Sequence, residues 1–287
     1  MSRSPTLRDA ALAEMAAITA RHPQHFRALP PTRVKAGALA LAAIMLLTIG
    51  LWRLDFAPSR LIDGVGQLIH FLGLMLPPAP GTWSRTLLIF QGLAETLAIA
   101  FLGTLGAAII AFPLGFLAAR NTSISRVVHF LSRRVLDGVR GIDSLIWALI
   151  WVSVVGLGPF AGVLAILTSD IGTFGKLFSE AIEAADRKPV EGVTASGGGK
   201  LHGIRFGVLP AVLPVMAGHV LYMLESNTRS STIIGIVGAG GIGLMLSEMI
   251  RMLEWDVVSF IVLLILAAVG VIDVISGRLR AALAGRR

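Results

Sequence analysis

Long apolar stretches alternate with short polar segments along most of this chain. A helix needs about 20 apolar residues to cross the hydrocarbon core of a bilayer, and in lipid only helices and closed barrels satisfy their own backbone hydrogen bonds. Continuous runs of this length favour helices. The pattern predicts an all-α integral membrane protein with about six transmembrane helices, over Val34–Trp52, Leu87–Leu117, Ser144–Gly156, Phe160–Phe178, Val208–Val237 and Val257–Ile275.

Two further segments carry apolar residues on one helical face. In Arg60–Leu76 these residues recur at helical spacing, as at Leu61, Val65 and Leu68, and Thr6–Arg21 also reads as a helix. A helix of this kind lies along the membrane interface or binds a partner. We favour the interfacial interpretation for both segments.

Composition excludes several classes of protein. Hydrophobic residues make up 55% of the chain, the mean hydropathy is +0.79 and only 15% of residues are charged, whereas a soluble domain carries about 25% charged residues. A soluble enzyme and a disordered chain are therefore both excluded. The chain has no cysteine, which rules out disulfides, thiolate metal ligands and a cysteine nucleophile.

The net charge of +8 falls mostly on one side of the predicted membrane. With the N-terminus in the cytoplasm, 20 of the 25 Lys and Arg residues lie in four cytoplasmic segments, 1–35, 119–143, 176–205 and 278–287. This asymmetry follows the positive-inside rule and predicts that both termini are cytoplasmic. It accounts for the positive charge without nucleic acid, for which no soluble basic domain is visible.

This orientation divides the chain into four parts. Residues 1–33 form a cytoplasmic tail with a short amphipathic helix, and 34–85 contain the first transmembrane helix and an amphipathic helix on the outer face. Residues 86–280 form the core of the remaining spans, and 281–287 form a basic cytoplasmic tail.

Two glycine-rich motifs match nucleotide-binding loops only in part. Gly238–Gly243 fits G-x-G-x-x-G, but it closes a membrane span and no acidic residue follows at the required distance of about 20 residues. Ser196–Lys200 hints at a phosphate loop, but Thr194 stands where that loop needs its first glycine. The six histidines are scattered and form no metal motif. We predict no catalytic residue, metal site or ATP site in this chain.

The predicted cytoplasmic loop 179–206 contains signals for a protruding helix. Pro189 in the first turn and Glu191 near the positive helix end favour a short helix that finishes at Gly197. A second short helix is expected from Lys200 toward Pro210. A helix, a glycine turn and basic residues together make a protrusion that another protein can grip.

This loop resembles a known motif. Glu191-Gly-Val-Thr-Ala-Ser-Gly197, followed thirteen residues later by Pro210, resembles the EAA loop of ABC-importer permeases, although Gly192 and Val193 replace its two alanines and Gly207 stands where isoleucine is usual. Over about residues 86–280 further motifs are similar to the phosphonate-transport permease family: Gly156-Leu-Gly-Pro159, Gly175-Lys-Leu-Phe-Ser-Glu-Ala-Ile-Glu183, Glu225-x-Asn-x-Arg229 and Gly235-Ile-Val-Gly-Ala-Gly-Gly-Ile-Gly243. One departure is Gly141-Ile-Asp143, where relatives carry an Ile-Pro-Glu-like sequence before the third span.

The resemblance implies a type I ABC-importer permease in the bacterial cytoplasmic (inner) membrane, with a cytoplasmic coupling-helix loop. Two copies in the lipid bilayer would form the pore, and separate ATPase subunits would carry ATP and Mg²⁺. An extracytoplasmic binding protein would deliver a phosphonate or a related phosphorus oxyanion. The coupling residues implied are Pro189, Glu191, Gly197, Lys200, Arg205 and Pro210.

Two alternatives to this function remain. The first is a permease for phosphite, phosphate or another small anion, with specificity set mainly by the binding protein. The second is an ion-coupled secondary transporter, which would need no coupling loop and often shows inverted repeats. No internal repeat is visible in this sequence.

Charged residues within the spans need a partner or a water-filled cavity, because an unpaired charge in lipid is costly. Four polar residues are predicted to line the translocation pathway, with the arginine attracting the anion: Glu95, Glu225, Asn227 and Arg229. The alternative is an internal salt bridge, since Glu225 and Arg229 stand four residues apart and Glu95 can also pair with Arg229. Asp170 is expected to be structural, and Asp273 to neutralise Arg278 or Arg280.

The glycines of 235–243 predict a non-helical turn near the outer face. Irregular backbone at membrane depth is tolerated where protein buries it or where it lines a cavity. The turn is therefore a candidate outer gate, formed by Gly238, Gly240, Gly241 and Gly243. A tight helix crossing, which small residues also allow, is the alternative.

Overall fold

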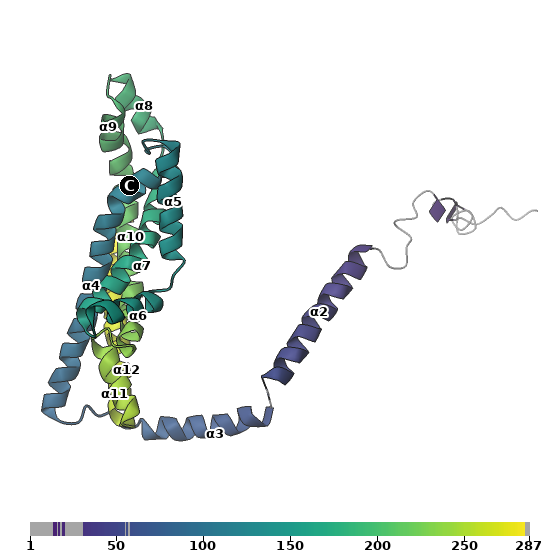
Figure 1. The fold of residues 1–287 in the computed structure, drawn as a ribbon, viewed down its shortest axis with the longest axis vertical. Helices are drawn as coiled ribbons and strands as arrows, with labels where there is room; N and C mark the ends of the chain where they lie inside the picture. Colours follow the sequence, from purple (N-terminus) through teal and green to yellow (C-terminus); the bar gives the residue numbers. More distant parts are fainter. Residues whose placement is uncertain are drawn as a thin grey trace, which may run out of the picture. The chain divides into compact units, whose positions relative to one another are not determined.

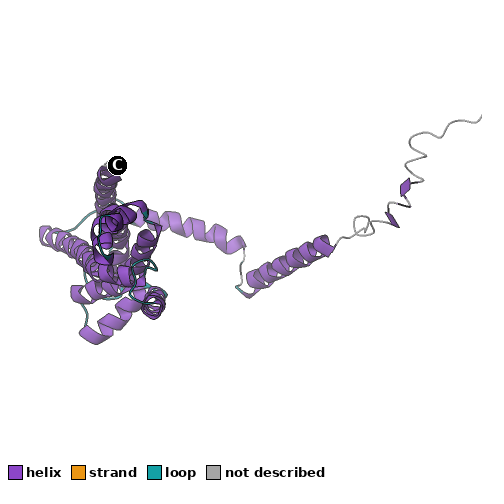
Figure 2. Ribbon diagram, turned by 90° about the horizontal axis from the view of Figure 1, so that it is seen from above, coloured by secondary structure: helices purple, strands orange, loops and turns teal. Residues whose placement is uncertain are grey.

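The computed structural model describes residues 14, 15, 17, 19, 20, 31–54, 56 and 58–284. Within these residues every regular element is helical (Figure 2). Five helices are long and apolar enough to cross a membrane, and a sixth crossing is counted if one bent helix pair is a single span. The chain divides into two compact units, residues 1–70 and 71–287.

The first unit contains α2 (Pro31–Arg53) and most of α3 (Pro58–Leu74). Helix α2 covers the predicted first span, and α3 covers the predicted amphipathic segment. No part of the apolar stretch Lys35–Arg53 is buried within the chain, so its apolar side chains are available to lipid. The helix predicted over Thr6–Arg21 lies mainly outside the described residues.

The second unit is a bundle in which α4 (Trp83–Ala118), α7 (Pro159–Ala184) and α10 (Leu209–Ile236) run side by side (Figure 1). Small residues bring α4 close to α7. A Cβ atom on Gly103 would lie 2.7 Å from the Cβ of Ile166, and one on Gly115 would lie 2.8 Å from the Cβ of Phe178. Glycine seams of this kind let membrane helices pack with their backbones in close approach.

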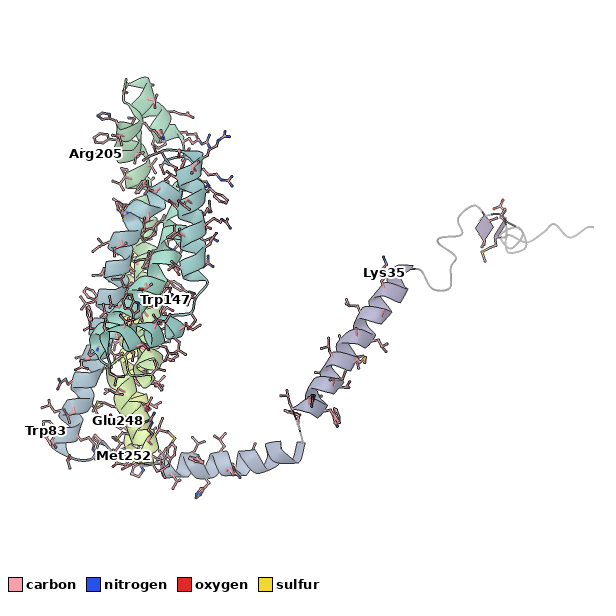
Figure 3. All side chains as sticks on the ribbon, in the orientation of Figure 1. Lys35, Trp83, Trp147, Arg205, Glu248 and Met252 are labelled. Carbon is pink, nitrogen blue, oxygen red and sulfur yellow. The ribbon has the colours of Figure 1, made fainter. Side chains whose placement is uncertain are left out.

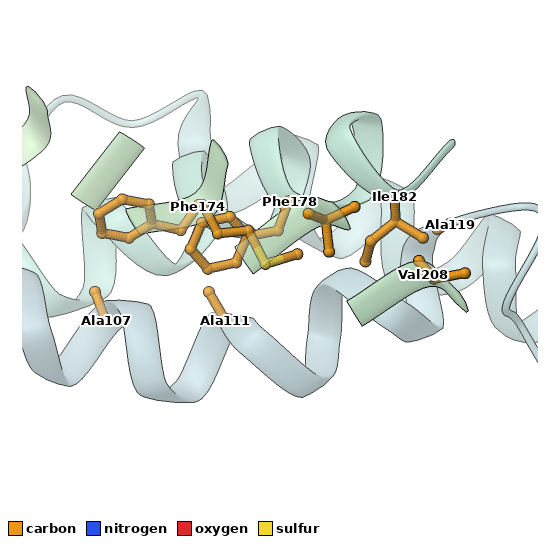
Figure 4. Close-up of a cluster of buried hydrophobic side chains, with 9 residues drawn as sticks. Ala107, Ala111, Ala119, Phe174, Phe178, Ile182 and Val208 are labelled. Carbon is orange, nitrogen blue, oxygen red and sulfur yellow. The ribbon is translucent and has the colours of Figure 1, made fainter. Parts of the chain in front are cut away.

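A buried apolar cluster joins these three helices at the end that leads to the predicted loop (Figure 4). Phe174 and Phe178 of α7 stack with ring centroids 5.3 Å apart. They pack against alanines of α4 and against residues of α10 or the turn before it; the cluster comprises Ala107, Ala111, Ala119, Phe174, Phe178, Ile182, Val208, Val212 and Met216. This cluster fixes the three helices that flank the loop.

The predicted third span, Ser144–Gly156, corresponds to the second helix of the bent pair that counts as a sixth crossing when it is taken as one span. Helix α6 (Ser144–Val155) has 12 residues and is about 18 Å long, which is shorter than the hydrocarbon core. It follows α5 (Arg126–Arg140) at a bend of 85°. The Asp143 side chain accepts a hydrogen bond from the Leu145 amide at 2.8 Å. Asp143 therefore starts a new helix where the sequence departs from its relatives.

The loop between α7 and α10 contains α8 (Lys188–Ala195), α9 (Lys200–His202) and the π-helical turn η1 (Gly203–Val208). The second short helix predicted over Lys200–Pro210 is not separate. It runs without a break into α10, so that Lys200–Ile236 forms one helical stretch of 37 residues. Pro210 lies in the first turn of α10, just after the π-helical turn, and Pro214 lies inside α10 without ending it.

Helices α11 (Ile242–Arg251) and α12 (Trp255–Ala284) complete the bundle. Arg205 of η1 lies at one end of the second unit, and Trp83, Glu248 and Met252 lie at the other (Figure 3). At this second end Arg85 at the start of α4 forms an ion pair with Glu254, which precedes α12. The ion pair ties together two spans that are distant in sequence.

Candidate coupling segment, polar cluster and glycine turn

The predicted coupling helix is present as α8. Pro189 and Glu191 lie in its first turn, and the helix ends just before Gly197, which has a left-handed φ of +84°. The Gly198 amide donates to the Val193 carbonyl at 2.9 Å, which closes the helix end. The expected short helix from Pro189 to Gly197 is confirmed within two residues.

Helix α8 has no buried residue and presents Glu191 to solvent. A pocket of about 580 Å³ lies between α8, the loop after α4 and η1, and is lined by Asn121, Thr194 and Lys200 among others. The Lys200 ammonium donates to the Ser123 carbonyl at 3.1 Å. Arg205 is exposed and lies over the Phe206 ring at 5.4 Å. The six residues selected from the sequence therefore gather in one exposed segment.

The residues predicted for the translocation pathway do not form one cluster. Asn227 is buried and donates to the Thr104 hydroxyl at 2.8 Å and to the Asp170 carboxylate at 2.5 Å. This polar cluster joins α4, α7 and α10. Asp170 thus has the structural contact expected of it, because a buried polar group must be hydrogen-bonded.

Glu225 faces a different helix. Its carboxylate contacts Arg280 of α12 at 3.1 Å and Arg229, one turn along α10, at 3.8 Å. The Arg229 side chain is 57% exposed, whereas that of Glu225 is 12% exposed. Arg280 therefore pairs with Glu225. Asp273 forms no ion pair with Arg278 or Arg280 in the part of the chain that the structure describes, so the expected role of Asp273 is wrong. Glu95 is half-buried and makes no ion pair with any residue that the structure describes.

The predicted glycine turn lies between α10 and α11. Gly238, Gly240 and Gly241 all have left-handed φ values, and Gly243 lies in the first turn of α11. The turn is tightly packed. The Gly158 amide donates to the Gly238 carbonyl at 3.0 Å, and the Thr96 hydroxyl accepts from the Ile242 amide at 2.8 Å. The structure thus holds the turn against the α6–α7 loop and α4.

Sequence reasoning missed a polar clamp beside the coupling segment. Arg133 of α5 pairs with Glu183 of α7 at 3.1 Å, and the Arg120 amide donates to the same carboxylate at 2.9 Å. Asn121 donates to the Ile182 carbonyl at 2.7 Å. A signal existed, since Glu180 and Glu183 recur at helical spacing near the end of an apolar helix, where they require basic partners.

No cofactor site emerges from these contacts. Among the described side chains, no three His, Asp or Glu residues come together as metal ligands. The three regions that do emerge are an exposed coupling segment, a buried polar cluster and a buried glycine turn.

Comparison with known proteins identifies the family. Residues 111–287 match the family described as binding-protein-dependent transport system inner membrane component. Over 274 residues the chain is 37% identical to HtxC of Stutzerimonas stutzeri, which is named for a phosphite transport system, and the match covers 96% of this chain and 92% of that protein.

Two further relatives are also named as permeases, and one solved structure shares the fold. The chain is 36% identical to the phosphate-import permease PhnE of Mycolicibacterium smegmatis over 81% of this chain and 43% of that protein. It is 45% identical to PhnE2 of Escherichia coli (strain K12), named for a cryptic phosphonate transport system, over 41% of this chain and 97% of that protein. The fold resembles a chain of the inward-facing MetNI methionine ABC transporter with a TM-score of 0.62 and 20% identity, covering 70% of this chain and 99% of that one.

These matches confirm the expected all-α fold of a type I importer permease and the expected membrane localisation. The family match covers more than half of the sequence, and HtxC aligns over nearly its whole length. This chain therefore belongs to the family of binding-protein-dependent transport system inner membrane components.

Proposed function

We propose that this chain is the membrane-spanning, non-catalytic subunit of an ATP-driven importer for a small phosphorus oxyanion: a phosphonate, phosphite or phosphate. The observation that carries the proposal is the combination of an exposed coupling helix, α8, with relatives named for transport of these three anions. All three have a tetrahedral phosphorus that carries at least three oxygens; the fourth substituent is an oxygen in phosphate, a hydrogen in phosphite and a carbon in a phosphonate. A chain of this family need not distinguish them if a binding protein delivers the substrate.

Energy for transport comes from separate ATPase subunits that bind ATP and Mg²⁺. Neither glycine motif of this chain has the context of a nucleotide loop, whereas α8 offers Pro189, Glu191 and Gly197 on an exposed segment. ATPase closure would move α8 and thereby the spans that flank it. The coupling segment and both termini would then lie in the cytoplasm, which the distribution of basic residues supports.

The pathway is expected to run along the face of α10 that bears Arg229. An arginine within a membrane-spanning helix requires water or a protein partner, and the Arg229 side chain is more than half exposed in the isolated chain. A second copy of the chain that encloses water against this face would meet that requirement. Arg229 would then attract the anion, with Glu225 setting the position of its guanidinium.

The glycine turn is proposed as the outer gate, on the side that receives the binding protein. Its carbonyl at Gly238 is bonded to the loop between α6 and α7. Opening would separate this turn from that loop. The close packing supports a gate with a well-defined closed state.

Growth on single phosphorus sources tests this function. A strain that lacks the gene is grown on methylphosphonate, phosphite or phosphate, in a background without other importers for these anions. The wild-type gene should restore growth on at least one source, and Glu191→Ala should not. Gly192→Ala is the matched control, because it changes an exposed position of the same helix to the residue usual in the EAA loop and its Cβ meets open space.

Each outcome has a separate meaning. Loss of growth on one source identifies the anion. Normal growth of the deletion strain on all three sources would reject phosphorus oxyanions as substrates. Restoration by Glu191→Ala at the wild-type rate would reject α8 as the coupling helix.

A further inference from the structure

We propose that α8 and the start of α10 form one rigid coupling unit, held together by Val190 in a notch between Gly203 and Gly207. Movement of α8 therefore passes directly to η1 and the start of α10, whereas α7 is reached only through a non-helical connection and the shared apolar cluster. The proposal rests on the proposed function, because it assumes that α8 is moved by an ATPase. Val190 and Gly207 act as positioning residues that set how α8 is joined to its own chain.

The notch is defined by distances that leave no room for another atom. A Cβ atom on Gly207 would lie 2.8 Å from the Cγ2 of Val190 and 3.0 Å from both its Cα and its backbone nitrogen. One on Gly203 would lie 3.2 Å from the Cγ1 of Val190. Backbone atoms cannot move aside as a flexible side chain can. Any residue larger than glycine at 207 therefore pushes α8 away from η1.

This packing explains a departure from the EAA pattern. Position 207 is glycine where isoleucine is usual, and position 193 is valine where alanine is usual. Val193 packs against the turn at Gly198, where an added Cβ would lie 2.7 Å from the Val193 Cγ1. Compared with the EAA pattern, α8 carries the larger residue Val193 and the facing turn η1 carries the smaller residue Gly207. The result is a closer approach of α8 to η1.

The connection on the other side of α8 is different. Residues 185–187 between α7 and α8 are not helical, and Ala185 has an extended conformation. The end of α7 is fixed elsewhere, through the Glu183 ion pair with Arg133 and the Ile182 carbonyl bonded to Asn121. A three-residue hinge thus separates α8 from a helix that is anchored to α5 and to the loop after α4.

One part of the boundary between the two bodies is the pocket of about 580 Å³, with Asn121 and Thr122 on one wall and Ile204 and Lys200 on the other. Elsewhere Val208 and Val212 are packed against Phe178 and Ile182 of α7. The hydrogen bond from Lys200 to the Ser123 carbonyl crosses this boundary and is exposed. The shape of this pocket and the exposed hydrogen bond from Lys200 to Ser123 can change at a small cost in free energy, whereas the close packing of Val190 against Gly207 cannot.

Reversible crosslinks test the proposal, and the absence of cysteine from the chain leaves no background reaction. A disulfide between V190C and G203C lies within the rigid unit, since a Cβ atom on Gly203 would lie 3.2 Å from the Cγ1 of Val190. A short bifunctional thiosulfonate between S123C and K200C joins the two bodies. Both are formed in the purified protein, the disulfide by oxidation with copper phenanthroline, and uptake of radiolabelled anion is measured in proteoliposomes with the ATPase and binding protein before and after dithiothreitol.

We expect the 190–203 crosslink to leave uptake within about twofold of the reduced protein, and the 123–200 crosslink to lower it about tenfold, with recovery on reduction. Loss of uptake in the 190–203 crosslink, or normal uptake in the 123–200 crosslink, would overturn the proposal. If the unmodified protein transports none of the three anions, the proposed function fails instead.

Amide hydrogen exchange of the purified chain gives a test that needs no transport. Gly207→Ala should speed exchange about tenfold in α8 and in η1 together, because it removes their shared packing. Gly192→Ala, whose Cβ meets open space, should leave both segments unchanged. Faster exchange confined to η1, or equal exchange in Gly207→Ala and wild type, would show that α8 does not depend on the notch.

Discussion

The glycine-rich segments that precede and follow α10 differ in what surrounds them. Before α10, an added Cβ on Gly192 or Gly197 would meet no other atom within 4 Å. After α10, a Cβ on Gly240 would lie 2.7 Å from the Pro159 nitrogen, and one on Gly243 would lie 2.0 Å from the Thr232 carbonyl oxygen. The surroundings of Gly192 and Gly197 are open to a partner, whereas the segment after α10 is closed by its own chain. Removal of the exposed Glu191 side chain beside Gly192 should therefore affect coupling, and a substitution after α10 should affect folding.

Gly243→Ala should have the largest effect, since its Cβ would collide with a backbone carbonyl that cannot move. Overpacking costs about 1–3 kcal/mol even where side chains can adjust, so we expect most of the protein to be lost from the membrane. Size-exclusion chromatography of a fluorescent fusion measures this. Gly218→Ala in α10 is the control, since its Cβ meets open space. If Gly243→Ala were folded and present in the wild-type amount, the segment after α10 would tolerate substitution and would not differ from the open segment before it.

Glu191→Ala should give the opposite result. We expect uptake to fall about tenfold or more while protein amount and melting temperature stay at wild-type values, because α8 has no buried residue. Uptake of labelled anion and a thermal melt measure the two quantities in the same preparation. A lower melting temperature would mean that Glu191 supports the fold rather than a partner.

Asn227→Ala probes the bundle between these two ends. It removes the donor shared by Thr104 and Asp170 and leaves a buried carboxylate without that partner, which costs about 1–3 kcal/mol. Thermal unfolding in detergent should show the loss. Asp170→Asn should cost less, because an amide retains hydrogen-bonding capacity at that position. Equal stability of Asn227→Ala and wild type would show that the polar cluster does not stabilise the bundle.

The smallest expected effect is the difference in stability between Arg280→Gln and Arg229→Gln, which compares the two ion pairs of Glu225. Arg280 is the closer partner of the nearly buried Glu225, so its loss should cost about 1 kcal/mol, while loss of the exposed Arg229 pair should cost about 0–0.5 kcal/mol. Transport should rank the other way, with Arg229→Gln the more impaired. If Arg280→Gln is the more impaired in uptake, the pathway runs between α10 and α12.

Much of the fold could be predicted from the sequence. Long apolar runs fix the existence of α2, α4, α7, α10 and α12, because no other structure satisfies their backbone in lipid. The apolar pattern alone does not show how α6 is placed in the bundle. The composition of α6 equals that of a span, and the bend of 85° depends on Asp143 starting a new helix, which is a local hydrogen bond and not a property of the apolar pattern.

The site was predicted to different degrees. The ends of α8 follow from Pro189, Glu191 and Gly197, since these residues act on the neighbouring backbone. The partners of Glu225 and Asn227 do not follow from sequence, because they depend on which faces of α4, α7 and α12 reach the same depth. Local spacing favoured Arg229 for Glu225, whereas the closer contact comes from Arg280, 55 residues away in the chain.

The helical stretch that begins at Lys200 is irregular in its first half and regular in its second half. Its two irregular points, the π-helical turn at Gly203–Val208 and Pro214, both lie in its first half. Beyond them, residues 215–236 continue for about 33 Å without a break. A tilt of this segment by about 10° would displace its far end, where the glycine turn begins, by about 6 Å. On the proposed function, even a small tilt of α10 would therefore be felt most at the turn held against Pro159, which would have to yield when that end of the helix moves.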